Sequence, residues 1–390
     1  MTRTLVALAA VALAAASAAL PAAEPAPAPA PKKLSERESF FRKSPVLKIS
    51  IEVDKKEVEK LGREPRKYAK STIKEGSEEL KDVGIHLKGA AGSWRDFNDK
   101  PGLTLNTDKF ADGQLFHGMD KWHLANSVQD PSYISELLCG ELYRACGVPA
   151  SRVAHALVTI NGRKRGLYYL KEGYDKEFLK EHFGNKNGNF YDGGFLRDID
   201  ADLQLISGEG DVANRADLKA LVAASREGDE KKRFEKLEKL LDMDRFITYL
   251  VLSSVTWDWD GYPLNRNNYR IYHDPKRDKI VFLPSGMDQM FGDPNGPILP
   301  GFQGMVASGV INTKEGKKRY FARMREIREK VFVVPALHKR LDELEAVVQP
   351  ALASVDQGAG RDYKNQVNRL REAIKIRAKA IDDQLKRVPQ

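Results

Sequence analysis

Acidic and amide side chains are concentrated in residues 257–292, where they lie between apolar stretches. Two short apolar runs, 269–272 and 280–283, flank a turn that contains an Asp-Pro pair, and this pattern predicts two paired strands. Pairing of the strands would bring Asp288 to the same end of the hairpin as the polar residues that precede it. Those earlier polar residues are Asp258, Asp260, Asn265, Asn267 and Asn268.

Carboxylate and amide oxygens gathered in this way could hold a hard divalent cation, which often shares one or two carboxylates with substrate phosphates. The cluster therefore predicts a metal and phosphate site. For each residue taken alone, the alternative is a solvated turn, because Asp and Asn favour turns. Hydrolysis by Asp258 and Asp260 as paired carboxylates fits less well. Residues two apart in an extended segment lie on one face, whereas glycoside hydrolysis needs two acids that flank the scissile bond.

Strands are expected to predominate in the first half of the chain and helices in the second, which is an α+β arrangement. Alternating apolar residues predict the strands, and an Asn-Gly turn at 161–162 predicts the clearest hairpin. A helix should begin near Asp130, and its Glu136 or Glu141 could pair with a lysine of the sheet or remain solvated. The predicted strands are 47–53, 83–88, 103–106, 121–126, 152–160 and 166–171, and the predicted later helices are 218–222, 234–241, 246–255, 317–331 and 362–385.

A glycine-containing segment follows the predicted strand at 83–88. Gly89, Gly92 and Ser93 could form a cradle of backbone amides for an anion. The segment matches neither the Walker pattern nor the kinase glycine loop, so a plain hairpin turn is an equal alternative. The basic side chains that would add charge to such a cradle are Lys88, Arg95 and Lys100.

The N-terminus has the features of an export signal. Arg3 precedes an alanine-rich apolar run over 5–20, which is shorter than the roughly 18 residues expected of a spanning helix. We expect a secretory signal peptide over 1–23 and a Pro/Ala-rich tether over 24–44. No later stretch is long and apolar enough to cross a bilayer, so the mature protein should be secreted or held in the cell envelope.

The composition is that of an ordinary globular protein, with 42% hydrophobic and 31% charged residues and a formal net charge of +9. Much of the positive charge is interspersed with glutamate, as in 231–239, which is typical of a solvated helix face and does not favour nucleic-acid binding. Cys139 and Cys146 lie seven positions apart in one predicted helix, about 10 Å. That separation is too long for a disulfide, so we expect free thiols.

Six segments, taken in order, resemble the CotH kinase family, which comprises spore-coat and secreted proteins with an atypical protein-kinase-like fold. Each segment alone is weakly specific, whereas their order along the chain is more specific. The segments are 84–107, 121–134, 147–153, 161–179, 259–272 and 282–292.

The resemblance implies a two-lobed kinase-like fold, with a β-rich lobe at 45–173 and a helical lobe at 174–390 that ends in basic helices. It also implies transfer of the γ-phosphate of ATP, with Mg²⁺ or Mn²⁺, to Ser or Thr hydroxyls of a protein at the cell surface or envelope. The alternative is a non-catalytic assembly protein that keeps the fold and binds a partner through its basic helices.

The resemblance also implies roles for individual residues. Asp260 would orient or deprotonate the acceptor hydroxyl, and Asp288 would hold metal. Asn268 is the best-placed amide for a second metal contact, with Asn265 and Asn267 behind it.

Three further positions follow from the same resemblance. Lys100 is the first choice for the phosphate-contacting lysine and Lys88 the second, while Glu172 would lie where the strand leaving the first lobe meets the nucleotide. Two stretches depart from the family pattern. Residues 284–286 read Pro-Ser-Gly where many members have Pro-Trp-Asp, and 90–93 read Ala-Ala-Gly-Ser where a form like Asn-Ser-Ser is common. The departure at Gly286 favours the non-catalytic alternative.

Overall fold

The computed structural model describes residues 34–208 and 215–389. The chain divides into two units, Met1–Leu34 and Ser35–Gln390, and everything below concerns the second. The predicted signal peptide and the first part of the predicted tether lie outside the described residues. The proposed division into lobes at 45–173 and 174–390 stays a prediction, because Ser35–Gln390 form one compact unit.

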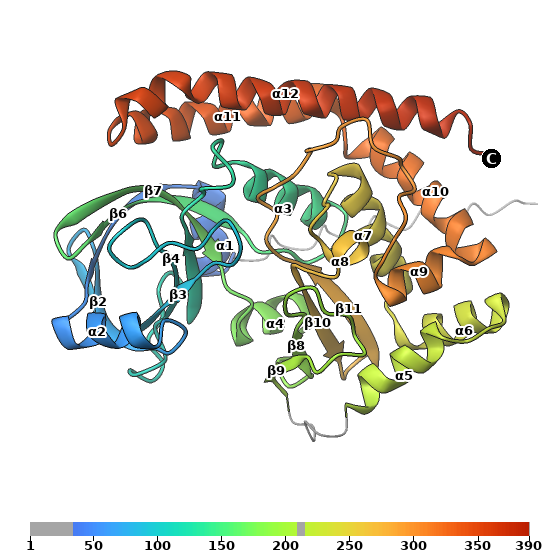
Figure 1. Cartoon of the computed structure of the whole chain (residues 1–390), viewed down its shortest axis with the longest axis horizontal. Helices are drawn as coiled ribbons and strands as arrows, with labels where there is room; N and C mark the ends of the chain where they lie inside the picture. The colour runs from blue at the N-terminus through green and yellow to red at the C-terminus, as the bar shows by residue number, and fades with distance from the viewer. Residues whose placement is uncertain (1–33, 209–214, 390) are drawn as a thin grey trace, which may run out of the picture. The chain divides into compact units, whose positions relative to one another are not determined.

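The strands of the first half close into a barrel with the order β1-β2-β3-β4-β5-β7-β6 (Figure 1). Adjacent strands are antiparallel except β1 and β6, which run parallel and close the barrel. Alternate side chains fill the interior, among them Ile51, Leu105 and Trp122, because successive residues of a strand point to opposite faces. The strands are β1 Val46–Glu52, β2 Ala69–Glu75, β3 Glu78–Lys88, β4 Gly102–Asn106, β5 Lys121–Ala125, β6 Val153–Ile160 and β7 Arg163–Glu172.

All six strands predicted for this half of the chain are confirmed, with ends that differ by a few residues, whereas β2 was not predicted. Three helices accompany the barrel: α1 Glu36–Lys43, α2 Lys55–Arg63 and α3 Ser135–Ala145.

Helix α1 corrects the predicted extent of the tether, which was expected to continue to residue 44. Its Phe40 and Phe41 are buried with the barrel core. Its Arg37 is also buried and forms ion pairs with Glu172 and Asp175 at 3.1 and 3.0 Å. The folded unit therefore begins before the first strand, because α1 buries apolar and ionic side chains that a solvated tether would leave exposed.

A second sheet, with the order β11-β10-β8-β9, lies among the helices of the second half. Its predicted hairpin is confirmed, since Tyr269 pairs with Pro284 and Asp274 with Lys279. The strands are β8 Phe190–Asp192, β9 Gln204–Ser207, β10 Tyr269–Asp274 and β11 Lys279–Pro284. The helices are α4 Lys176–Phe183, α5 Ala216–Ser225, α6 Glu230–Leu240, α7 Met243–Val255, α8 Tyr262–Asn265, α9 Met305–Ile311, α10 Lys314–Lys330, α11 Val334–Ala353 and α12 Gln357–Leu385.

Helices α11 and α12 run side by side along one edge of the fold (Figure 1). From α12, Tyr363 donates its hydroxyl hydrogen to the carbonyl of Ser132, which precedes α3. The buried Arg377, also from α12, donates to the carbonyls of Ser254 and Val255 at the end of α7. Helix α12 therefore contacts both the segment that precedes α3 and the end of α7, the helix that leads into the polar cluster. No helix in the two described stretches combines the length and apolar character needed to cross a membrane.

The two cysteines are free thiols, as predicted. Cys139 is fully buried, and burial raises the pKa of its thiol well above the usual value. Its protonated thiol is a packing group rather than a nucleophile.

Candidate active site

The outer face of the barrel carries basic side chains where it meets the helical half. In β3 and β7 the apolar neighbours Leu87 and Leu170 point into the barrel core. Lys88 and Lys171 therefore point outward, because side chains alternate along a strand. His123 of β5 pairs in register with Lys171 and lies on the same outer face. These three residues come from different strands, and the pairing of β3, β4, β5 and β7 as neighbours in the sheet places them on one face.

Glu136, in the first turn of α3, forms a buried ion pair with Lys171. The two side chains are only 2% and 6% exposed. The helix begins at Ser135 rather than near Asp130 as predicted, and its N-cap residue is Ile134. The Asp130 carboxylate accepts hydrogen bonds from the backbone amides of Ser132 and Ser135 at 2.9 Å each and so holds the segment that leads into the helix. The prediction that Glu136 or Glu141 would pair with a lysine of the sheet is thus confirmed for Glu136.

The same glutamate also contacts the segment after β11. Its Oε2 accepts a hydrogen bond from the backbone amide of Met287 at 2.6 Å. This contact ties α3 and the barrel lysine to the residue immediately before Asp288. One buried carboxylate therefore connects the barrel, α3 and the polar cluster.

Asp288 lies in an electrostatically unfavourable position for a carboxylate. Burial and the charges of Glu136 and Asp130 raise its pKa to about 7. Within the described residues its side chain makes no ion pair and no side-chain hydrogen bond; its own backbone amide and the nearby charge of Lys171 oppose the rise in pKa only in part. A bound cation would supply the missing positive charge.

Positive charges surround the same place. Burial, together with the charge of Lys171, lowers the pKa of Lys88 to about 8, while Glu136 and Asp288 act in the opposite direction. Arg270 of β10 is close enough to contribute to the same effect. Burial and these cations hold the pKa of His123 well below its usual value, so its imidazole is neutral. This combination of two lysines, an arginine and the unpaired carboxyl group of Asp288 suits a polyanion that carries a metal ion.

Asp260 is held by the three asparagines predicted to accompany it. Its Oδ1 accepts from Asn265 at 2.8 Å, and its Oδ2 accepts from Asn267 and Asn268 at 3.0 and 2.8 Å. Two left-handed residues, Arg266 and Asn268 with φ of 54° and 50°, fold the segment so that the three amides converge. The carboxylate therefore has a fixed orientation before any substrate binds.

Asp258, by contrast, lies beneath this cluster and is only 2% exposed. Burial and the charges of Asp260, Glu136 and Asp288 raise its pKa well above the usual value. The hydrolase interpretation of paired acids at 258 and 260 is therefore wrong, since only one of the two can meet a substrate.

Gly286 packs directly against Asn268. A Cβ atom at position 286 would lie 2.8 Å from both Cγ and Oδ1 of Asn268, and the glycine has φ of +66°. The amide oxygen of Asn268 thus lies on the side of the segment that leads to Asp288. Many family members have Asp where this chain has Gly286. The absence of a side chain at this position leaves room for Asn268.

Substitution Gly286→Ala should lower the free energy of unfolding by about 1–3 kcal/mol, because the new methyl group would displace Asn268 and strain the backbone. Gly292→Ala is the matched control, since a Cβ there meets nothing within 4 Å and needs no left-handed backbone. Urea unfolding of both variants measures the effect. Equal stability of the two variants would contradict the packing described here.

Two residues that were predicted to bind the nucleotide, Lys100 and Glu172, do not belong to the cluster around Asp288. Lys100 donates to the hydroxyl of Tyr133 at 2.9 Å, and no contact in the described residues joins it to Lys88 or Asp288. Glu172 is completely buried and pairs with Arg37 and Arg152, so its carboxylate is not available to a ligand.

The glycine segment forms a turn. The backbone amides of Ser93 and Trp94 both donate to the carbonyl of Ala90, and the amide of Ala90 donates to the Ser93 hydroxyl. The structure thus supports the hairpin-turn alternative, because the segment connects the antiparallel strands β3 and β4 and the Ser93 amide, one of the three expected in the anion cradle, is already bonded within the turn.

Sequence reasoning did not single out Lys171, Arg270 or His123 for the site. The available signal was a basic side chain next to buried apolar neighbours in each strand: Leu170 before Lys171, Tyr269 and Ile271 around Arg270, and Trp122 and Leu124 around His123. Within the described residues, no three or more His, Cys, Asp or Glu side chains form a ready-made metal-ligand set.

The buried pair of Lys171 and Glu136 thus lies beside Asp288, and Asp260 with its asparagines precedes the same hairpin. The chain belongs to the CotH kinase family: residues 85–381 match the family described as CotH kinase protein.

Curated relatives agree with this assignment. Invasin CotH3 of Rhizopus delemar is 27% identical over 187 residues, covering 43% of this chain and 31% of the relative. Spore coat protein homolog 1 of the same organism is 24% identical over 213 residues, covering 50% and 35%. Inner spore coat protein H of Bacillus subtilis is 21% identical over 293 residues, covering 69% and 77%. This chain thus spans about a third of the length of the Rhizopus relatives.

Among solved structures, the proinflammatory kinase CtkA of Helicobacter pylori is similar over 76% of this chain and 96% of its own, with 6% identity and a TM-score of 0.32. A score this low supports no argument about mechanism.

Proposed function

We propose that this protein is a phosphotransferase that moves the γ-phosphate of ATP to Ser or Thr hydroxyls of a protein at the cell surface or envelope. The observation that carries the proposal is the buried pair of Lys171 and Glu136, which is tied through Met287 to the unpaired carboxylate of Asp288. In phosphoryl transfer, positioning and charge neutralisation provide most of the catalysis, and this arrangement offers both.

The residues present fit a divalent cation, Mg²⁺ or Mn²⁺. Asp288 would hold it through its otherwise unpaired carboxylate, and the Oδ1 of Asn268 is the nearest candidate amide oxygen, with Asn265 and Asn267 behind it. When bound, the cation supplies charge neutralisation for the phosphates.

The cationic side chains would orient the nucleotide. Lys171, held by Glu136, and the neighbouring Lys88 and Arg270 can bind phosphate oxygens. Lys88 thus replaces Lys100 as the preferred phosphate lysine among the residues chosen from sequence.

Asp260 would act on the acceptor. With three amides fixing its carboxylate, it can accept a hydrogen bond from an incoming hydroxyl and take its proton as the new bond to phosphorus forms. The neighbouring Trp259 is 42% exposed and offers an apolar surface beside that acid.

The surface or envelope location is also part of the proposal. It is supported by the predicted signal peptide and by relatives whose names refer to spore coats and invasion. Charge interspersed along the helices offers no support for a nucleic-acid partner.

We expect the purified protein to transfer label from [γ-³²P]ATP to itself or to a Ser- and Thr-containing protein when Mg²⁺ or Mn²⁺ is present, and to stop when EDTA removes the metal. Gel autoradiography and phosphoamino-acid analysis measure the product. Absence of transfer with several divalent metals and several acceptor proteins would contradict the proposal.

The second candidate is a non-catalytic assembly protein, which is favoured by Gly286 in a stretch where many members of the family carry an acid. Nucleotide and metal should then leave the melting temperature unchanged. A metal-dependent rise in melting temperature with ATP argues against this candidate.

A further inference from the structure

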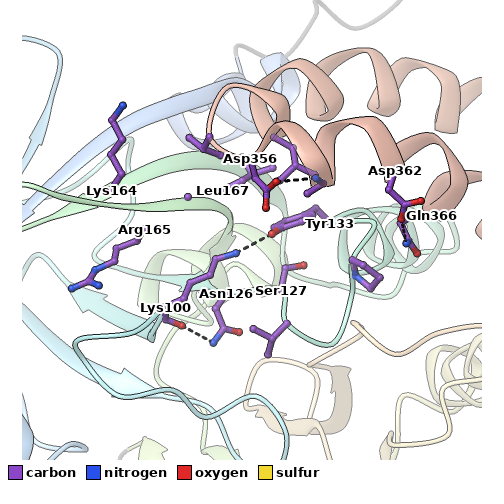
Figure 2. Close-up of a pocket in the computed structure, with 16 residues that line it drawn as sticks. Lys100, Asn126, Ser127, Tyr133, Lys164, Arg165, Leu167, Asp356, Asp362 and Gln366 are labelled. Atoms are coloured by element: carbon purple, nitrogen blue, oxygen red, sulfur yellow. Dashed lines mark hydrogen bonds between the residues drawn. The ribbon is translucent and has the colours of Figure 1, made fainter.

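A pocket of about 470 Å³ lies between the barrel and the turn from α11 to α12 (Figure 2). Its floor is the loop between β5 and α3, from which Asn126, Ser127 and Tyr133 face the cavity, and its far wall includes Asp356 at the start of α12. The volume is in the range of small-ligand sites. The loop that forms the floor continues into α3, which carries Glu136.

Lys100 projects into this pocket without a carboxylate partner. Its ammonium group donates to the Tyr133 hydroxyl at 2.9 Å and lies over the rings of Tyr133 and Tyr168, at 5.1 and 5.2 Å from their centroids. Burial lowers its pKa to about 8, and within the described residues no ion pair offsets its charge. A buried cation of this kind is costly unless an anion accompanies it.

The floor of the pocket is held in a strained conformation. Ser127 and Tyr133 have φ of 55° and 57°, in the left-handed region that such residues rarely adopt. The carbonyl of Tyr133 is held by His155, whose Nε2 lies 2.8 Å away. Strain of this kind persists where the surroundings impose it and is common at ligand sites. In this conformation the phenol oxygen of Tyr133 accepts a hydrogen bond from the ammonium of Lys100. The phenol hydrogen therefore remains available for donation to a ligand.

The charges facing the cavity match a singly charged anion. Figure 2 shows Lys164 and Arg165 pointing away from the centre, whereas Lys100 points toward Tyr133. Asp356 faces the same space, although its Oδ1 is used to cap Ala359. Asp362 also lines the pocket, and its carboxylate accepts hydrogen bonds from Asn365 and Gln366. A dianionic phosphate would meet one ammonium and two carboxylates, which is a poor match. A monoanion needs only the single ammonium.

The remaining walls are apolar. Leu167 comes from the barrel, and Leu352 and Val355 come from the end of α11 and the turn after it. They would contact a hydrocarbon body that extends from the charged group.

We propose that this pocket binds a small monocarboxylate with an apolar body, whose carboxylate is bonded by Lys100 and Tyr133. The site is separate from the proposed phosphotransfer site, and the inference does not depend on that function.

Hexanoate is the probe. Isothermal titration calorimetry on the full chain should show saturable binding, and Lys100→Met should weaken it at least tenfold, because the carboxylate would lose its cation. Tyr133→Phe keeps the ring and should weaken binding severalfold. Lys318→Met is the matched control, since Lys318 is exposed and makes no contact in the described residues, and it should leave binding unchanged. Circular dichroism melting checks that each variant is folded.

Three results would overturn the proposal. The first is hexanoate binding that is unchanged in both Lys100→Met and Tyr133→Phe. The second is equal binding of hexanamide or inorganic phosphate, which would remove the carboxylate requirement. The third is competition between hexanoate and ATP with Mg²⁺ for one site, which would assign the pocket to the nucleotide.

Discussion

Replacement of Asp288 by asparagine is expected to reduce phosphate transfer at least about a hundredfold while the protein remains folded. The substitution keeps the size of the side chain but removes the carboxylate that would hold the cation. Because burial and Glu136 raise the pKa of Asp288 to about 7, the charge is a cost to the folded protein without metal at neutral pH. The variant should therefore be at least as stable as the wild type when metal is absent.

Initial rates of label transfer and urea unfolding, each measured with EDTA and with Mn²⁺, separate these effects. Asp112→Asn is the matched control, since Asp112 is exposed and has no bonded partner in the described part of the chain. It should leave both quantities unchanged. Equal transfer by wild type and Asp288→Asn would remove the metal role of this residue, and a large loss of stability would show that its role is structural.

Substitution Lys171→Met should abolish measurable transfer and lower the free energy of unfolding by about 3–5 kcal/mol. Both members of its ion pair are nearly inaccessible to water, so removal of the lysine leaves Glu136 buried without its cation. The double variant Lys171→Met/Glu136→Gln should regain most of the stability, because the unpaired charge is then absent, but it should not regain transfer.

The comparison is Lys176→Met, which removes a lysine whose side chain is 43% exposed and which pairs with Asp108 at 2.7 Å and more loosely with Asp120 at 3.5 Å. Such a pair contributes about 1 kcal/mol or less, so this variant should remain close to wild type in both assays. Chemical unfolding of the wild type, Lys171→Met, Glu136→Gln and the double variant forms a double-mutant cycle, and Lys176→Met is measured beside it. If Lys171→Met is no less stable than Lys176→Met, the buried pair does not have the energetic role described here.

The acidic and amide cluster was predictable because its members are close in sequence. Asp260 and its asparagines lie within nine residues, and local turns suffice to bring them together. Asp288 follows at the end of a two-stranded hairpin that the two apolar runs and the turn between them predicted. The contacts among these residues could be predicted from the sequence. The roles that the family resemblance gives them are proposals.

The basic residues of the site could be identified only from the tertiary structure. Lys88, Glu136 and Lys171 are far apart in the chain, and they meet because β3, α3 and β7 are placed by closure of the barrel and by the contact of Glu136 with the amide of Met287. Alternation along a strand shows that a lysine faces away from the apolar core, but not which other element it faces. For that reason Lys100 was a reasonable first choice from sequence, although it lies in a different pocket.

The sequence by itself therefore determined the α+β order of elements, the family and the acidic cluster, since all three depend on local pattern. Tertiary structure alone decided which lysine joins that cluster, that Asp258 is inaccessible, and that Gly286 makes room for Asn268. Each of these depends on long-range packing, because burial and pairing are properties of neighbours that the chain brings together only when the barrel and the helices have assembled.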